Sequence, residues 1–201
     1  MTTPKHAAWL FDLDGTLYVP LPVKLMMAAE LALFGAGKIK SIGAFRKEHE
    51  NLRGSDSHFA PSPYSEQLNR AAQKLGCPQD ELAQIVGKWM QDKPRKWIRM
   101  CARRSMIAEL RSFRAAGGKT ALVSDYPATG KLKALGIFED FDVVVSNGEP
   151  GGPTRLKPFP DGYQIAAEAL GCSAAECLVI GDREDADGLA ASRAGMAFRL
   201  V

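Results

Sequence analysis

The stretch Trp9-Leu10-Phe11-Asp12-Leu13-Asp14-Gly15-Thr16-Leu17 decides how this chain folds. Residues 7–13 are apolar apart from Asp12, which is typical of a strand buried on both faces of a parallel sheet. The carboxyl ends of such strands are where open α/β sheets bind ligands. Because two acids, a glycine and a hydroxyl follow this strand, we expect a site for phosphate and a divalent cation there.

The spacing within this loop indicates a division of labour. Neighbouring strand residues point to opposite faces, so Asp12 and Asp14 aim roughly the same way as the strand ends. One carboxylate can attack a substrate while the other handles protons. Gly15 permits a turn and a close ligand approach, and Thr16 adds a hydroxyl and exposed amides to an anion-binding concavity. An Asp-Gly turn without further function would give the same local pattern.

Three later stretches favour the functional interpretation. Residues 119–125, Lys-Thr-Ala-Leu-Val-Ser-Asp, form a short apolar strand that ends in a hydroxyl. Residues 155–158, Arg-Leu-Lys-Pro, place a cation before a helix-excluding proline. Residues 177–187 form another buried strand that ends in an acidic cluster. Each of these stretches follows a predicted strand or lies in a loop at the same end of the sheet.

In this order the four stretches resemble the signatures of the haloacid dehalogenase-like superfamily of aspartate-nucleophile phosphatases. The resemblance covers the chain except residues 18 to about 100. It implies that Asp12 attacks a phosphoryl group and becomes an aspartyl-phosphate. It implies that Asp14 protonates the leaving alcohol and later activates the water that hydrolyses the intermediate.

The resemblance also implies which residues bind the substrate phosphate and the metal ion. Lys157 would be catalytic by neutralising charge, and the substrate phosphate would be bound by Thr16, Ser124, Asp125 and Lys157. Mg2+, a hard cation that prefers oxygen ligands, would be held by the Asp12 and Asp182 carboxylates and the main-chain carbonyl of Asp14.

The acidic cluster leaves its outer acid open between two residues. Asp187 fits the family spacing best and would orient Lys157 or a metal-bound water from outside the ligand set. Asp185 is the alternative. Glu184 and Asp185 are more simply explained as a negatively charged first turn of a helix.

Strands and helices are predicted to alternate through the second half of the chain. Together with residues 7–13, the expected strands are residues 119–123, 142–145, 177–180 and 197–201. The expected helices are residues 104–116, 130–135, 161–170 and 188–194. The resemblance implies an α/β fold, with a Rossmann-like three-layer core, a parallel sheet of strand order 5-4-1-2-3 and a small helical cap.

The predicted division assigns residues 1–18 and 98–201 to the core and residues 19–97 to the cap. Cap helices are expected at residues 23–34, 65–75 and 79–90. Such caps close over a site, exclude water and select the substrate.

Two cap segments allow more than one interpretation. Residues 88–104 hold seven cations, one acid and two tryptophans. They suit a funnel for an anionic substrate, or more simply a solvated helix face with its tryptophans packed inward. The apolar residues 25–34 suit a pocket lining, a membrane or partner surface or, as the commoner explanation, packing between helices.

Composition describes an ordinary globular protein. The 201 residues are 46% hydrophobic and 24% charged, with a net charge of +3 that demands no nucleic-acid partner. The four cysteines form no Cys-x-x-Cys pair, which favours reduced thiols and a cytoplasmic location. Residues 25–34 are too short to span a membrane. We expect a monomer or homodimer that acts on a small phosphorylated metabolite.

Several other functions were weighed. The dehalogenase branch of the family lacks an acid at the position of Asp14, because a halide leaving group needs no proton. A phosphonate hydrolase would need a cap lysine that forms an imine, and a phosphomutase would use the same acids while excluding water. A non-catalytic phosphate-binding regulator would not need Asp14, and a receiver domain has no cap after its first strand. His6, His49 and His58 show neither metal spacing nor a nucleophile partner.

Overall fold

The computed structural model describes residues 6–201, so the first five residues of the predicted core lie outside it. Five parallel strands form one sheet in the order β3-β2-β1-β4-β5, which is the predicted order read from the other edge. The strands are β1 (Ala8–Phe11), β2 (Lys119–Ser124), β3 (Val143–Ser146), β4 (Cys177–Gly181) and β5 (Ala197–Leu200). The predicted Rossmann-like fold is confirmed.

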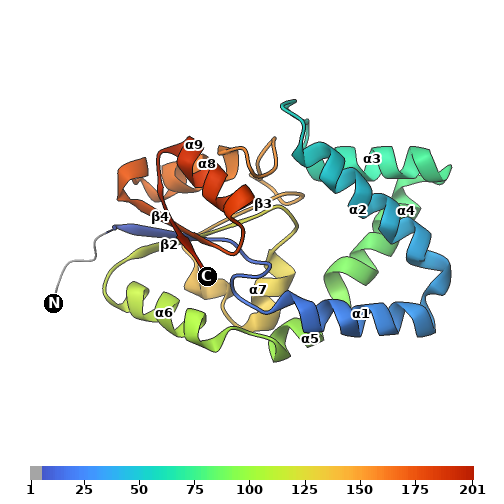
Figure 1. The fold of residues 1–201 in the computed structure, drawn as a ribbon, viewed down its shortest axis with the longest axis horizontal. Helices are drawn as coiled ribbons and strands as arrows, with labels where there is room; N and C mark the ends of the chain where they lie inside the picture. The colour runs from blue at the N-terminus through green and yellow to red at the C-terminus, as the bar shows by residue number, and fades with distance from the viewer. Residues whose placement is uncertain (1–5) are drawn as a thin grey trace.

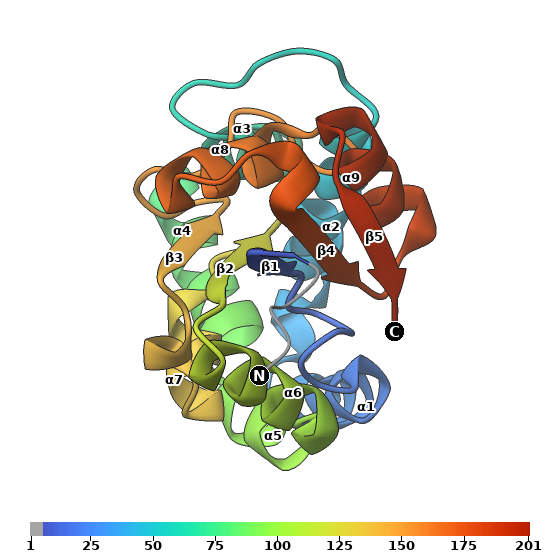
Figure 2. The same ribbon diagram turned by 90° about the vertical axis from the view of Figure 1, so that its left-hand side faces the viewer.

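Helices cover both faces of this sheet (Figure 2). Helices α8 (Asp161–Leu170) and α9 (Leu189–Ala194) pack on one face, and α6 (Arg104–Ala115) and α7 (Thr129–Leu135) on the other. Leu10 belongs to the first of these cores and Phe11 to the second, because successive strand side chains point to opposite faces. Both are fully buried, which explains why β1 is apolar without alternation.

The remaining helices gather beyond the carboxyl edge of the sheet (Figure 1). They are α1 (Pro20–Phe34), α2 (Ile39–Arg53), α3 (Pro63–Leu75), α4 (Gln79–Val86) and α5 (Arg95–Met100). Short helical turns lie at Ala36–Lys38, Gly87–Asp92, Phe138–Asp140, Ala174–Glu176 and Glu184–Gly188. Helices α2, α3 and α4 share a small apolar core of their own, as expected of a helical cap, whose limits at residues 19 and 97 stay a prediction.

Helix α2 was not predicted from the sequence. Its buried stripe, at helical spacing, mixes apolar Phe45 and Leu52 with polar Glu48 and His49. The polar members are satisfied by partners on α3: Glu48 pairs with Lys74, and the ring of His49 is 3.3 Å from the Gln67 amide oxygen. An apolar periodicity search misses a helix whose inward face is partly polar.

The favoured interpretation of residues 25–34 as packed between helices is wrong. Within α1 only Val23 is buried, while Leu33 and Phe34 are each 75% exposed. Apolar residues stand all around this helix, and only a narrow stripe can face its neighbour α5.

Over residues 6–201 no single helix is long and apolar enough to cross a membrane; α1 and the segment Ala36–Arg53 meet that test only as a pair bent by 112°.

Candidate active site

The predicted site residues meet where β1, β2 and β4 end side by side. Phe11 is in register with Leu122 of β2 and Ile180 of β4, and the Asp12 amide donates to the Ile180 carbonyl at 2.9 Å. Asp12, Ser124 and Asp182 therefore lie at one edge. They line a cavity of about 390 Å³ between the sheet and the helices beyond it.

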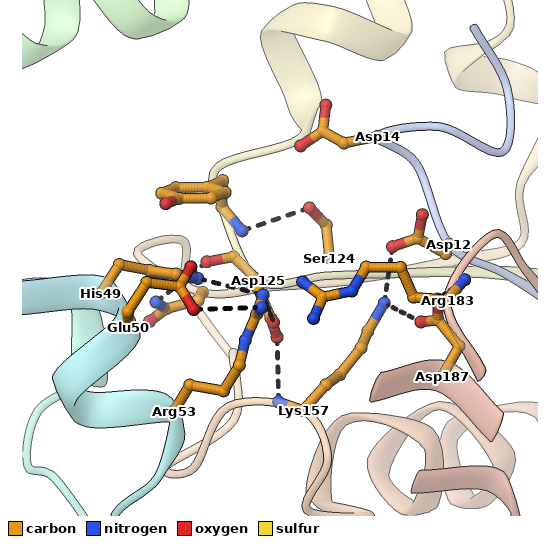
Figure 3. Close-up of polar contacts among 12 residues, drawn as sticks. Asp12, Asp14, His49, Glu50, Arg53, Ser124, Asp125, Lys157, Arg183 and Asp187 are labelled. Atoms are coloured by element: carbon orange, nitrogen blue, oxygen red, sulfur yellow. Dashed lines mark hydrogen bonds and ion pairs between the residues drawn. The ribbon is translucent and has the colours of Figure 1, made fainter. Parts of the chain in front are cut away.

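Lys157 joins two carboxylates at the centre of this edge (Figure 3). Its ammonium lies 2.6 Å from Asp12 Oδ1 and 2.7 Å from Asp187 Oδ1. The Tyr163 hydroxyl donates to the same Asp187 oxygen at 2.8 Å, and the Thr16 hydroxyl donates to Asp12 Oδ2 at 3.0 Å. Sequence reasoning did not identify Tyr163, which comes from α8 and has no motif of its own.

Burial and the ion pairs of Lys157 act in opposite directions on the pKa values of this site. Burial raises the pKa of the Asp12 carboxyl above its usual range, although the Lys157 charge acts in the opposite direction. Burial would lower the pKa of Lys157, but the charges of Asp12 and Asp187 outweigh it and the pKa rises. The ammonium therefore stays charged next to the expected nucleophile.

Three carboxylates form a group that fits a divalent cation. Ligand oxygens of Asp12, Asp182 and Asp187 all lie within 4.8 Å of one another. Asp187 is already engaged by Lys157, Tyr163 and the Arg183 amide, so it suits an outer position. Burial and then the Asp187 charge raise the pKa of Asp182, so a cation beside Asp182 would be stabilised. The oxygen-only donor set suits Mg2+.

The two candidates for the outer acid have different surroundings. Asp187 is buried on Lys157, whereas Asp185 is exposed and pairs with Arg183 at the surface. Asp187, the better-fitting prediction, is the one with the expected contact.

Gly15 is required by close packing at this site. It adopts a φ of +110°, and a Cβ atom built there would stand 1.9 Å from Asp182 Oδ2. A side chain at position 15 would therefore occupy the space of the expected metal ligand.

Asp14 lines the same cavity and lies apart from the Lys157 contacts drawn in Figure 3. Lys131 Nζ lies 2.6 Å from its Oδ1 and 2.7 Å from its Oδ2, and the Tyr18 hydroxyl also donates to Oδ1. Burial would raise the pKa of Asp14, but Lys131 and Tyr18 together lower it. Neither Lys131 nor Tyr18 was predicted from the sequence.

The loop after β2 places Ser124 and Asp125 differently. Ser124 is buried, lines the cavity and accepts from the Tyr126 amide at 3.2 Å. The Asp125 carboxylate accepts from the Lys157 amide at 3.1 Å and from Arg53 at 3.2 Å. Since that carboxylate is engaged by Arg53 and the Lys157 amide, the predicted phosphate contact of Asp125 would fall to its main-chain amide.

Helix α2 supplies a wall of the cavity that the sequence analysis missed. Arg46, His49, Glu50 and Arg53 recur at helical spacing and line the cavity. His49 stacks on Tyr126 of the core, with ring centroids 4.2 Å apart. Burial lowers the pKa of His49, and Arg53 adds to this against the charge of Asp125. The signal that could have predicted this helix is the recurrence of these polar residues three and four positions apart in the sequence.

The basic residues of the 88–104 segment do not form the suggested funnel. None of these seven cations is among the described residues that line the cavity. Lys93 and Lys96 pair with Glu30, and Trp89 is buried, in agreement with the simpler interpretation. Residues of this segment that do reach the cavity are uncharged, namely Trp89, Met90, Gln91, Pro94 and Ile98.

Comparison with known proteins identifies relatives of this chain. It is 33% identical over 155 residues to "Putative phosphatase YhcW" of Bacillus subtilis, a match covering 74% of this chain and 64% of YhcW. It is 26% identical over 198 residues to the 5-amino-6-(5-phospho-D-ribitylamino)uracil phosphatase YigB of Escherichia coli, covering 94% of this chain and 81% of YigB. The matched region is thus slightly less than two thirds of YhcW.

Solved structures share the fold at low identity. The magnesium-bound structure of YfnB from Bacillus subtilis superposes with a TM-score of 0.64 at 15% identity, covering 98% of this chain and 89% of YfnB. Haloacid dehalogenases and a β-phosphoglucomutase also share the fold. The family model described as haloacid dehalogenase-like hydrolase matches residues 7–195. This chain therefore belongs to the haloacid dehalogenase-like hydrolase family.

Proposed function

We propose that this protein is a Mg2+-dependent phosphatase that hydrolyses a small phosphomonoester through an aspartyl-phosphate on Asp12. One observation carries the proposal: the buried Lys157 ammonium touches both Asp12 and Asp187, beside Asp182 at the end of β4. This arrangement orients one carboxylate and surrounds it with the charges that phosphoryl transfer requires.

In the first step Asp12 attacks the phosphorus while the bond to the leaving oxygen breaks. Lys157 and Thr16 hold the two Asp12 oxygens, at 2.6 and 3.0 Å, and so fix the direction of attack. Lys157 and the Ser124 hydroxyl stabilise the charge on the transferring group. Asp14 enters this step protonated, although Lys131 and Tyr18 favour its ionised form, and it gives its proton to the leaving alkoxide, which departs as an alcohol.

In the second step a water molecule hydrolyses the aspartyl-phosphate. Asp14, now a carboxylate, takes a proton from that water as the oxygen attacks phosphorus, and the bond between Asp12 and phosphorus breaks. Inorganic phosphate leaves and both acids return to their starting forms.

Mg2+ held by Asp12, Asp182 and the main-chain carbonyl of Asp14 would neutralise charge on the phosphoryl oxygens. The magnesium in the YfnB structure supports this choice of metal for the shared fold. Asp187 would act from outside the ligand set by keeping Lys157 in place.

The cavity supports hydrolysis of a phosphate ester over phosphonate cleavage. Lys24 is the lysine that lines the cavity from the described part of the predicted cap, and it is exposed to water. An imine-forming lysine is usually activated by a desolvated pocket or a neighbouring cation. The phosphatase names of YhcW and YigB point the same way.

The test is a panel of phosphorylated metabolites that includes 5-amino-6-(5-phospho-D-ribitylamino)uracil, the compound in the name of YigB. We expect phosphate release with Mg2+, none after chelation, and background rates for Asp12→Asn. Asp185→Asn serves as the control, because Asp185 is an exposed acid of the same cluster. Absence of turnover by the folded wild type with every compound would favour a phosphate-binding regulator.

A further inference from the structure

Asp14 is held in an unusual way for a group that must exchange protons with a substrate. Lys131, 117 residues away in the chain, contacts both of its oxygens, at 2.6 and 2.7 Å. The hydroxyl of Tyr18, four residues after Asp14, donates to Oδ1. Three side chains from two distant parts of the sequence thus form one hydrogen-bonded group at the wall of the cavity.

Lys131 is built into the wall and does not extend to the surface. It is 7% exposed, although lysine is almost never fully buried unless it is paired. Its ammonium is also 5.8 Å from the centre of the Tyr126 ring, within the range of a cation–π contact. Lys133, on the same helix, has the exposed side chain that is usual for a lysine.

The Tyr18 side chain is equally fixed. It is 5% exposed. Its backbone forms isolated β-bridges with Asp14 and with Ala102, which lies between α5 and α6. Both partners of Asp14 are therefore immobilised by packing, which restricts the carboxylate to one orientation.

The contacts also determine which oxygen can exchange a proton. An ionised carboxylate offers about four lone-pair positions, two on each oxygen. Lys131 and Tyr18 occupy both positions on Oδ1, and Lys131 takes one on Oδ2. One position on Oδ2 is left. The Asp14 side chain keeps 30% exposure, and all three residues line the cavity.

We propose that Lys131 and Tyr18 are positioning residues that turn Oδ2 of Asp14 toward the leaving-group oxygen of the substrate. The proposal rests on the phosphatase function proposed above. The proton moves from Oδ2 to the leaving oxygen as the phosphorus–oxygen bond breaks, and a water proton restores it in the second step. Lys131 and Tyr18 keep their own protons throughout.

Comparing two leaving groups distinguishes a positioning role from a merely structural one, because only the positioning role predicts a loss that depends on the leaving group. A simple alkoxide needs a proton as it departs, whereas 4-nitrophenolate departs readily without one. We would measure kcat/KM, which reports the first transfer step, with an alkyl phosphate and with 4-nitrophenyl phosphate. For Lys131→Met we expect a loss of roughly 10- to 100-fold with the alkyl phosphate, within the range of general acid catalysis, and a much smaller loss with the nitrophenyl ester.

Matched variants separate positioning from folding. Lys133→Met, on the exposed side of α7, should change neither rate. Lys131→Arg keeps a charged donor and should recover part of the alkyl activity. Tyr18→Phe removes one hydroxyl without leaving a buried charge, and should show the same selective loss if Lys131→Met does not fold. In an Asp14→Asn background, Lys131→Met should add no further selective loss, because the group it positions is gone.

Equal losses with both esters, or an undiminished effect of Lys131→Met in the Asp14→Asn background, would overturn the positioning role while the phosphatase function stands. If the folded wild type hydrolyses neither ester nor any panel compound, the phosphatase function fails and this inference fails with it.

Discussion

At the scale of single residues, the two acids Asp182 and Asp187 have different surroundings. Asp187 is fully engaged by Lys157 and Tyr163, while Asp182 faces the cavity beside Asp12. The two acids follow the same strand, yet their surroundings differ. Under the proposed function, Asp187 keeps the lysine in place and Asp182 binds the metal ion.

Asp182→Asn should therefore weaken Mg2+ binding. Even residues outside a ligand set typically cost 10- to 100-fold in metal affinity, so loss of a ligand carboxylate should cost at least about tenfold. Titration calorimetry with Mg2+ alone measures this. Asp185→Asn, which removes an exposed acid of the same cluster, should leave the affinity unchanged. Equal Mg2+ affinities for Asp182→Asn and the wild type would exclude Asp182 as a ligand.

The sequence predicted that these acids and the lysine lie close together, because each follows an apolar strand or precedes a proline, and the structure places them together. Lys131, Tyr18 and Tyr163 could not be predicted in the same way. Lys131 meets Asp14 across 117 residues only because the fold brings α7, which follows β2, against the loop after β1. Such a contact depends on the tertiary arrangement and leaves no local pattern.

At the scale of elements, β1 and α2 contribute opposite walls of the cavity. Strand β1 is predictable because both of its faces are buried, so its sequence is apolar throughout. Helix α2 is not, because its inward stripe contains His49, a buried polar residue satisfied by Gln67 and stacked on Tyr126. Through Arg53 and His49 this helix contacts Asp125 and Tyr126, which follow β2.

The buried His49 should make stability depend on pH. Its pKa is lowered by burial in the folded protein, while the unfolded chain keeps the ordinary value of about 6.5. Below that value the unfolded state binds a proton that the folded state does not. The free energy of unfolding should therefore fall as the pH decreases below about 6.5, by up to about 1.4 kcal/mol per pH unit from this residue.

Denaturant unfolding of the wild type and His49→Gln between pH 5 and 8 would measure this contribution, with ~0.3 pH-unit steps resolving the slope. The slope should be shallower in His49→Gln. His58→Gln is the control, because His58 is an exposed histidine that bonds Thr154. Parallel stability curves for wild type and His49→Gln would refute the linkage.

At the scale of the whole molecule, the order of the strands explains why distant motifs form one site. Strand β1 lies between β2 and β4, so the loops that follow all three meet at one edge. The sequence predicted this order through the family resemblance, and the structure confirms it. The cap is less predictable: its apolar helix α1 exposes Leu33 and Phe34, and a cytoplasmic location and the oligomeric state stay predictions.

The central claim is that Asp12 carries the phosphoryl group between two chemical steps. Rapid acid quench of the enzyme during turnover with Mg2+, followed by peptide mass spectrometry, measures this directly. The account predicts one phosphoryl group on the peptide containing Asp12 and none in Asp12→Asn. Steady hydrolysis with no phosphoryl group on Asp12, or with the group on another residue, would contradict it.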